Sequence, residues 1–268
     1  MEYMSVKEAS ARWGISERRV RALCESGRIE GVTHIGDWVW SIPASAERPA
    51  DGRTLRYMKN RNLKTGANDY KGVDSCKALA KNAVLTETQK QKIIAQAFAY
   101  DGILYTQKQL ASVFSLRPVD VPFSDCVRIL NMRSVINSFP CETTEKAICQ
   151  INKSLLCNID DKRGGVVRPE AKQEIEALVK QYSGDWSILH PVARAAFMFT
   201  EILRIKPFDK GNTATAFAVL ANEMLKEKLP PVIFDTDSIG QLRAALASAE
   251  LRGNAHQLVS MIIEAMTK

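Results

Sequence analysis

A short segment in the second half of the chain has the residue types to handle an anion. It runs from Lys206 to Asn212 and ends in a Gly-Asn pair before an apolar stretch. Unpaired backbone N–H groups and the helix dipole favour negative charge at a helix N-terminus. Lys206 and Lys210 add two positive charges, and Gly211 allows close backbone approach. We therefore expect Lys210, Gly211 and Asn212 to bind an anion or a nucleotide, the alternative being that both lysines point into solvent.

Two predicted helices position this segment. Pro191 begins the most apolar helix of the chain, which runs to Leu203, and the next helix runs from about Thr213 to Lys226. Capping residues and apolar stripes predict further helices on either side. These helices span about 86–99, 106–114, 143–156 and 169–182, with two short ones after Ser238 and Asn254. The C-terminal part of the chain is therefore expected to be all-α.

The segment from His190 to Asn212 reads HPVARAAFMFTEILRIKPFDKGN. It resembles the Fic domain, whose signature loop reads His-Pro-Phe-x-Asp/Glu-Gly-Asn-Gly-Arg-x-x-Arg. Residues 164–168 resemble the Gly-x-x-Arg of that family, residues 100–106 its inhibitory segment, and residues 230–233 the turn after its last core helix. The resemblance covers about residues 90–265 and implies a Fic-like helical domain.

The resemblance implies a chemistry that this chain has largely lost. Fic enzymes move AMP, or another phosphate-containing group, onto a target hydroxyl with a histidine base, an acidic magnesium ligand and two arginines. Here Lys206 stands at the histidine position, Lys210 at the acidic position, and Ala214 and Phe217 at the arginine positions. The retained residues are those that shape the loop: Pro207, Phe208, Gly211 and Asn212.

These replacements predict an inactive Fic-like adenylyltransferase. Lys206 could act as the catalytic base only if its pKa fell by several units from about 10.4. Lys210 cannot bind magnesium, and Asp209 is displaced by one position from the place of the family's ligand. We therefore expect no metal and no cofactor. Asp101 occupies the position of the family's inhibitory glutamate, and Pro169 directly follows Arg168 where the family usually has a longer flap.

The N-terminal segment has the pattern of two short helices followed by a hairpin. Ser5 and Glu8 form a capping box for a helix from Val6 to Trp13, Gly14 breaks that helix, and Ser16 caps a second one. Two strands, 33–35 and 38–42, then turn at Gly36-Asp37. The order and spacing resemble the excisionase-like and MerR-like winged helix-turn-helix family.

This second resemblance implies a DNA-binding surface. The second helix of that family enters the major groove, so Arg18, Arg19 and Arg21 would meet bases or phosphates, and Arg28 a phosphate. The alternatives are a winged helix that binds protein, and three arginines on an ordinary solvated face. Residues 1–72 carry 13 basic and 9 acidic residues, a net charge of +4 out of +7 for the whole chain. Such an excess favours a polyanionic partner.

The expected domain organisation has three parts. A winged helix-turn-helix spans 1–48, a basic linker 49–74, and a Fic-like helical domain 75–268. The fold class is therefore mostly α: a small N-terminal winged helix-turn-helix plus a larger all-α domain.

Composition limits the class of protein further. The chain has 268 residues, 46% of them hydrophobic and 25% charged, which is typical of globular proteins. Its apolar runs fall short of the ~18–20 residues that span a membrane, and the N-terminus lacks the pattern of a signal peptide. The six cysteines form no CxxC pair, which indicates reduced thiols. We expect a soluble cytoplasmic protein without a membrane partner.

Two functions compete on these grounds. One is a DNA-binding regulator whose degenerate Fic-like domain acts as a sensor or interaction module. The other is an active Fic-type AMP transferase with altered chemistry. The expected partners are double-stranded DNA and either a nucleotide or phosphate-containing ligand or a protein, and a homodimer is left open.

Overall fold

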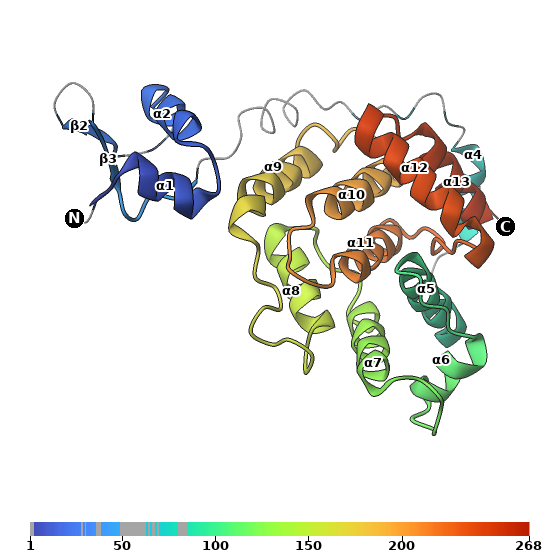
Figure 1. The fold of residues 1–268 in the computed structure, drawn as a ribbon. Helices are drawn as coiled ribbons and strands as arrows, with labels where there is room; N and C mark the ends of the chain where they lie inside the picture. The colour runs from blue at the N-terminus through green and yellow to red at the C-terminus, as the bar shows by residue number, and fades with distance from the viewer. Residues whose placement is uncertain are drawn as a thin grey trace. The chain divides into compact units, whose positions relative to one another are not determined.

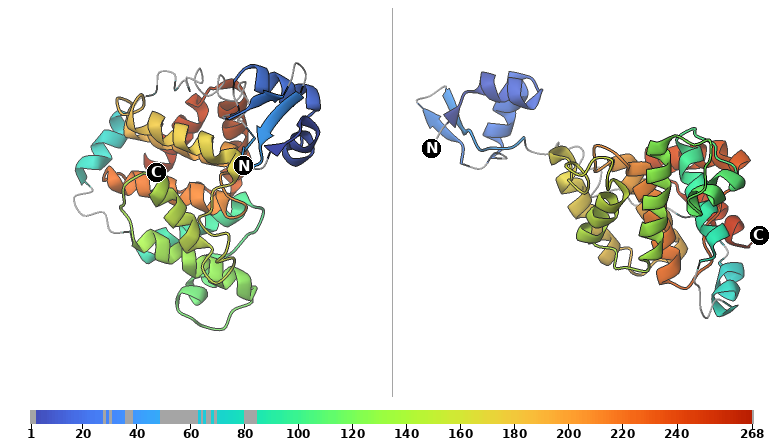
Figure 2. Two further views of the ribbon diagram at one scale, coloured as in Figure 1. Left: turned by 90° about the vertical axis from the view of Figure 1, so that its left-hand side faces the viewer. Right: turned by 90° about the horizontal axis from the view of Figure 1, so that it is seen from below.

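The computed structural model describes residues 3–27, 29, 31–35, 39–48, 63, 65, 68, 70–79 and 85–267. The chain divides into two compact units, Met1–Lys59 and Asn60–Lys268. Figures 1 and 2 show the elements of each unit.

The first unit combines two helices with a small sheet. Helix α1 (Val6–Trp13) begins with the predicted capping box of Ser5, and Gly14 ends it in the left-handed conformation with φ 62°. Ser16 caps α2 (Glu17–Glu25). The sheet has strand order β1-β3-β2, with all pairs antiparallel. Its strands are β1 (Tyr3–Met4), β2 (Thr33–Ile35) and β3 (Val39–Pro43).

A small apolar core joins these helices to the sheet. Trp13 and Ala9 of α1 and Val20 of α2 are buried, together with Met4 and Ile42 from paired strands. The sequence did not predict β1, because two residues give no alternating pattern. Met4 is held there by its antiparallel pairing with Ile42, whose side chain is completely buried.

The second unit is helical among its described residues and has a central pair of helices (Figure 1). Helices α10 (Pro191–Ile205) and α11 (Asn212–Lys226) pack on each other more extensively than any other described pair. The prediction that the helix beginning at Pro191 is central is confirmed. Around α10 and α11 lie α5 (Glu87–Tyr100), α7 (Phe123–Asn137), α8 (Glu145–Leu155), α9 (Lys172–Ser183), α12 (Ile239–Arg252) and α13 (His256–Thr267).

Two helices of the second unit were not predicted. Helix α7 begins after Pro122, which makes no side-chain cap, so its start carries no capping signal. Helix α4 (Lys71–Leu79) overlaps the end of the predicted linker, so the expectation that residues 71–74 are linker is wrong. Val73 of α4 is completely buried, and α4 packs against α13. Apolar burial therefore extends the helical unit further toward the N-terminus than composition indicated.

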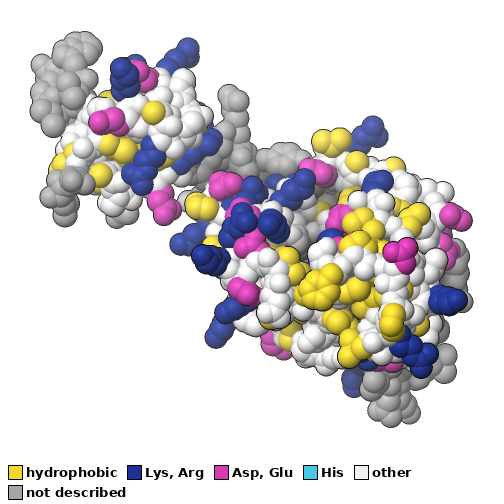
Figure 3. Space-filling model, turned by 60° about the horizontal axis from the view of Figure 1, so that its bottom comes forward, with side chains coloured by type: hydrophobic (Ala, Val, Ile, Leu, Met, Phe, Trp, Pro, Cys, Tyr) yellow, Lys and Arg dark blue, Asp and Glu magenta, His cyan; other side chains and the backbone are white. Residues whose placement is uncertain are grey.

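The remaining elements are short. Helix α6 (Gln107–Phe114) packs on α5 and α7, and single 3₁₀ turns lie at Pro169–Ala171 and Thr236–Ser238. Among the described residues, no helix combines the length and apolar character needed to cross a membrane. Hydrophobic side chains gather on one face of the second unit with charged side chains around them (Figure 3).

Candidate functional site

The loop between α10 and α11 is closed by its own side chains. Lys206 ends α10 in the left-handed conformation, with φ 49°, and Gly211 precedes α11 with φ 77°. The Asn212 Oδ1 atom accepts the Phe208 N–H at 3.0 Å, and Asn212 Nδ2 donates to the Phe208 carbonyl at 2.7 Å. Asn212 is thus one of the retained residues that shape the loop, as the sequence analysis expected. Both polar atoms of the Asn212 amide therefore maintain the loop conformation.

A buried asparagine on α8 supports the loop from below. Asn152 is completely buried, and its Nδ2 donates to the Lys210 carbonyl at 3.0 Å and to Thr215 Oγ1 at 3.1 Å. Its Oδ1 accepts the Gly165 N–H at 2.9 Å. One side chain thus joins the loop, α11 and the segment after α8. Sequence reasoning did not identify Asn152, because its three partners lie 13, 58 and 63 residues away.

Arg168 fastens the other side of the loop. Its guanidinium donates to the carbonyls of Ile205 and Lys206 at 3.0 and 2.8 Å. Its backbone N–H donates to the Pro207 carbonyl at 2.8 Å, and Val167 forms a β-bridge with Phe208. Because its guanidinium and its backbone N–H bond to the carbonyls of residues 205–207, Arg168 stabilises the end of α10.

Lys210 points away from the loop backbone toward an aspartate. Its Nζ lies 3.0 Å from Asp160 Oδ2, and Arg163 lies 2.8 Å from the same oxygen. The hydrogen bond from Lys210, followed by that from Arg163, lowers the pKa of Asp160 below its ordinary value. Lys206 and Asp209 are exposed. The positive charge of Lys210 is thus partly neutralised by a residue that the sequence analysis did not single out.

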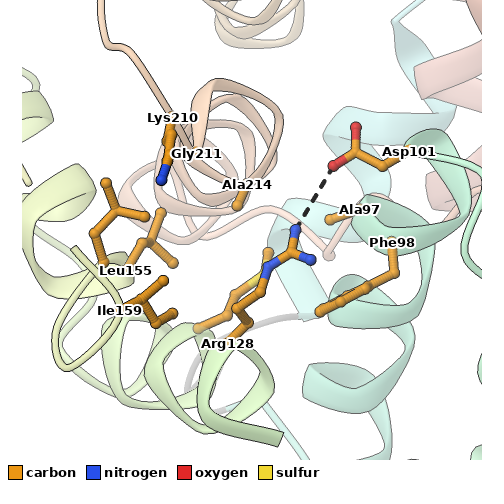
Figure 4. A pocket seen from close by; sticks show the side chains of 11 residues that line it. Ala97, Phe98, Asp101, Arg128, Leu155, Ile159, Lys210, Gly211 and Ala214 are labelled. Carbon is orange, nitrogen blue, oxygen red and sulfur yellow. Dashed lines mark ion pairs between the residues drawn. The ribbon is translucent and has the colours of Figure 1, made fainter. Parts of the chain in front are cut away.

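A cavity of about 290 Å³ lies beside this loop (Figure 4). Apolar side chains form much of its lining, and three charged residues, Asp101, Arg128 and Lys210, also line it. Gly211 and Ala214 bring the first turn of α11 to its wall. The structure therefore places Asp101 and two of the predicted binding residues, Lys210 and Gly211, around one pocket.

Comparison with known proteins identifies this helical arrangement. The model of the Fic/DOC family matches residues 142–224, which include α8, the loop and most of α11. The chain contains a Fic/DOC family domain. No curated protein sequence gives a significant match.

Solved Fic structures have the same fold. Fic-1 (residues 134–508) from C. elegans is 16% identical with TM-score 0.64, and the match covers 81% of this chain and 71% of that one. A Fic family protein from Desulfovibrio desulfuricans G20 is 14% identical with TM-score 0.60, covering 76% of this chain and 74% of that one. A Fic domain containing signaling protein from Bacteroides thetaiotaomicron is 17% identical with TM-score 0.56, covering 75% and 95%.

The two residues expected at the arginine positions of the Fic signature lie in different surroundings. Phe217 is buried and packs edge-on against Phe199 at 4.9 Å and Tyr100 at 5.9 Å between ring centroids. Ala214 lines the pocket instead. Phe217 is thus part of the core, and Ala214 presents only a methyl group at the pocket wall.

The residues at this Fic loop do not fit a magnesium ion. Lys210, which we expect at the position of the family's acidic ligand, pairs through its ammonium with Asp160. Within the described part of the chain, no group of three or more His, Cys, Asp or Glu side chains could hold a metal ion.

Asp101 faces an arginine that the Fic signature does not contain. Arg128 NH2 of α7 lies 3.9 Å from Asp101 Oδ2, and Arg128 NH1 lies 3.1 Å from Asp125 Oδ1. The Arg128 guanidinium also stacks on the Phe98 ring at 4.7 Å. Sequence analysis missed Arg128 together with the whole of α7.

The arginines proposed to contact DNA lie on α2 of the first unit. Arg18 is exposed, Arg19 is half-buried, and Arg21 is exposed and pairs with Glu17 at 2.9 Å. Arg28 lies outside the described residues. Lys and Arg side chains are visible on the face of this unit in Figure 3.

Proposed function

We propose that this protein is a cytoplasmic DNA-binding regulator whose Fic domain recognises a ligand or partner instead of transferring AMP. Members of the Fic family usually transfer AMP to a target. In this chain the first unit would bind double-stranded DNA, and the Fic domain would report the presence of a small molecule or protein to it. A protein partner and a homodimer stay predictions.

The observation that carries this proposal is that the Fic loop keeps its backbone contacts while lysines stand at its reactive positions. Its backbone is held by Asn152, Arg168 and Asn212, whereas the reactive positions hold Lys206, which is exposed, and Lys210, which pairs with Asp160. Losing a general base costs typically 10²–10⁴-fold in rate, and losing the metal ligand removes further charge stabilisation. A loop that keeps its backbone conformation without a general base or a metal ligand supports a role in binding a ligand or partner.

The DNA-binding half is supported by the elements of the first unit. Helix α1, the turn at Gly14 and helix α2 occur in the order of a helix-turn-helix, and β2 and β3 follow as a hairpin. Arg18 and Arg21 are exposed on α2. Arginine side chains on an exposed helix can bind phosphates or guanine edges in a major groove.

A labelled-ATP assay tests the catalytic half. Purified full-length protein with ATP and magnesium should label neither itself nor proteins of a lysate. Lys206→His alone should not rescue transfer, because the metal-ligand and arginine positions remain replaced. Labelling that Lys206→Ala abolishes would support the alternative, an active transferase with altered chemistry, for which the pocket beside Gly211 is the favouring observation.

A DNA-binding assay tests the other half. The full-length protein should shift duplex genomic fragments, with an affinity that falls steeply as salt rises because phosphate contacts release counterions. Arg18→Ala should weaken binding about 5- to 150-fold if it contacts a base, as each such contact is worth ~1–3 kcal/mol. Arg117→Ala, an exposed arginine of the Fic domain, is the matched control. Affinity that is insensitive to salt would contradict the proposal.

A further inference from the structure

The pocket beside the Fic loop is mainly apolar and small. Its volume of about 290 Å³ is at the lower end of the ~300–1,000 Å³ typical of ligand pockets. Its apolar lining comes from α5, α7, α8 with the turn that follows, and α11. The members are Ala97, Phe98, Met132, Leu155, Leu156, Ile159 and Ala214. A ligand that buries itself here must present a hydrocarbon surface.

One guanidinium is held at this pocket by neighbouring side chains. Arg128 NH1 pairs with Asp125 at 3.1 Å, and its Cζ lies 4.7 Å from the centre of the Phe98 ring. Asp125 in turn accepts the Tyr105 hydroxyl at 2.5 Å. Burial and the bond to Asp125 raise the pKa of Tyr105 to about 12, so this hydroxyl remains a donor at neutral pH. The position of Arg128 is therefore set before any ligand arrives.

The other side of this guanidinium meets a weak partner. Arg128 NH2 lies 3.9 Å from Asp101, and the two side chains are 37% and 38% exposed. An ion pair of this length and exposure contributes little. Figure 4 shows the Asp101 carboxylate and the Arg128 guanidinium facing each other, with Ala214 nearby. A ligand carboxylate closer to NH2 can replace Asp101 and gain a charge-assisted hydrogen bond.

The other charged residues at the pocket indicate how many negative charges a ligand can carry. Lys210 is the other cation in the lining, and Asp160 already partly neutralises it. Asp101 and Asp125 add negative charge around Arg128. A triphosphate would bring several negative charges to a pocket whose best-placed cation is a single guanidinium. A monoanion that takes the place of Asp101 leaves the charge around Arg128 unchanged, and the apolar walls match a hydrocarbon body.

We propose that this pocket binds a small carboxylate with an apolar body, such as an aromatic or medium-chain acid, through Arg128. The carboxylate pairs with Arg128 in place of Asp101, and the hydrocarbon packs on Phe98, Met132 and Leu155. Asp101 is then released into solvent at the end of α5. This inference rests on the part of the proposed function in which the Fic domain recognises a ligand, and it is independent of DNA binding.

Calorimetry on the full-length protein tests this site, with benzoate and octanoate as probes and inorganic phosphate and ATP as comparisons. Benzoate or octanoate should bind at millimolar concentration or better, and ATP should bind at least about tenfold more weakly, a difference of 1.4 kcal/mol. Arg128→Gln should weaken carboxylate binding at least about tenfold. The control Lys108→Gln, an exposed charge on α6, should leave binding unchanged.

Two further variants keep the test decisive if Arg128→Gln fails to fold. Asp101→Asn removes the competing carboxylate, so the probes should bind several-fold more tightly, an effect that misfolding cannot produce. Ala214→Leu fills the pocket wall without changing charge and should abolish octanoate binding.

Several outcomes would overturn this inference. These are the absence of binding by both carboxylates, an unchanged affinity in Asp101→Asn, or Arg128-dependent binding of ATP or phosphate that equals that of octanoate. Each would leave the labelled-ATP and DNA-binding results untouched. A failure of this inference is thereby distinguishable from a failure of the proposed function.

Discussion

The two ends of α11 use polar side chains in opposite ways. At its N-terminus, polar side chains hold the backbone of the Fic loop, Lys206 and Lys210 are exposed, and an open pocket lies beside the loop. At its C-terminus the polar groups close on a buried carboxylate. Glu223 is 1% exposed, accepts the Tyr182 hydroxyl at 2.7 Å, and also accepts the Thr143 hydroxyl. Arg194 lies 3.9 Å from it.

The difference separates structural polar groups from available ones. Burial, followed by the hydrogen bond to Glu223, raises the pKa of Tyr182, so the phenol stays protonated and continues to donate. Asn222, next to Glu223, exchanges two hydrogen bonds with the backbone of Cys141. The Tyr182 hydroxyl, the Glu223 carboxylate and the Asn222 amide are all bonded to partners within the protein. A charged cluster is therefore evidence for a binding site only when, as at the N-terminal end, a cavity and weakly held charges accompany it.

Removing the carboxylate of the closed end should have the largest effect. Glu223→Ala leaves the Tyr182 and Thr143 hydroxyls without their acceptor, in a site that is closed to water. We expect a loss of about 3–5 kcal/mol in the free energy of unfolding, measured by urea denaturation. The exposed carboxylate Glu264, changed to alanine, is the control and should cost no more than about 0.5 kcal/mol. Comparable losses for the two variants would show that the hydrogen bonds of Glu223 do not contribute to the free energy of unfolding.

Filling the close contact between Gly165 and the backbone of Cys149 should have the next largest effect on stability. Gly165 has φ 75°, and a Cβ added there would lie 2.6 Å from the Cys149 carbonyl oxygen. Gly165→Ala should therefore cost about 2–3 kcal/mol, from the left-handed conformation and the displaced backbone. Gly240→Ala, where an added Cβ meets nothing within 4 Å, is the control and should be neutral or stabilising. Thermal unfolding of both variants measures the difference.

The support beneath the loop should give an intermediate effect. Asn152→Ala deletes hydrogen bonds to Lys210, Thr215 and Gly165. We expect about 2 kcal/mol of destabilisation, together with faster amide hydrogen exchange in residues 206–211. Gln150→Ala, an exposed amide on the same helix, should change neither quantity. If exchange in the loop stays slow in Asn152→Ala, Arg168 and Asn212 suffice to hold it.

The smallest effect belongs to the outward-facing lysine. Asp160 has a lowered pKa in the folded protein, so its contribution to stability is present above the ordinary pKa of about 3.9 and is lost as pH falls through the folded value. Lys210→Gln should raise the pKa of Asp160 toward the ordinary value, because it removes the first cause of the shift. Carboxyl NMR titration measures this directly. An unchanged pKa would mean that Arg163 alone determines it.

Local sequence patterns predicted much of the helical framework. The capping box predicted at Ser5 is confirmed, and the helices expected from about residues 86 and 106 begin with capping boxes at Thr86 and Thr106. Each box joins residues three positions apart. The loop signature predicted the Fic fold and the role of Asn212. By contrast, α4 and α7 have weaker start signals in the sequence, and their existence depends on packing against distant helices.

The sequence by itself determined most of the helices, the Fic resemblance and the identities of the loop residues. Only the tertiary structure decided which charges are available. It paired Lys210 with Asp160, fifty positions earlier, and placed Arg128 opposite Asp101 at the pocket. Helix caps are formed by neighbours within one turn, so a sequence displays them. Ion pairs and pocket walls join residues from different helices, and their partners become known only when those helices pack.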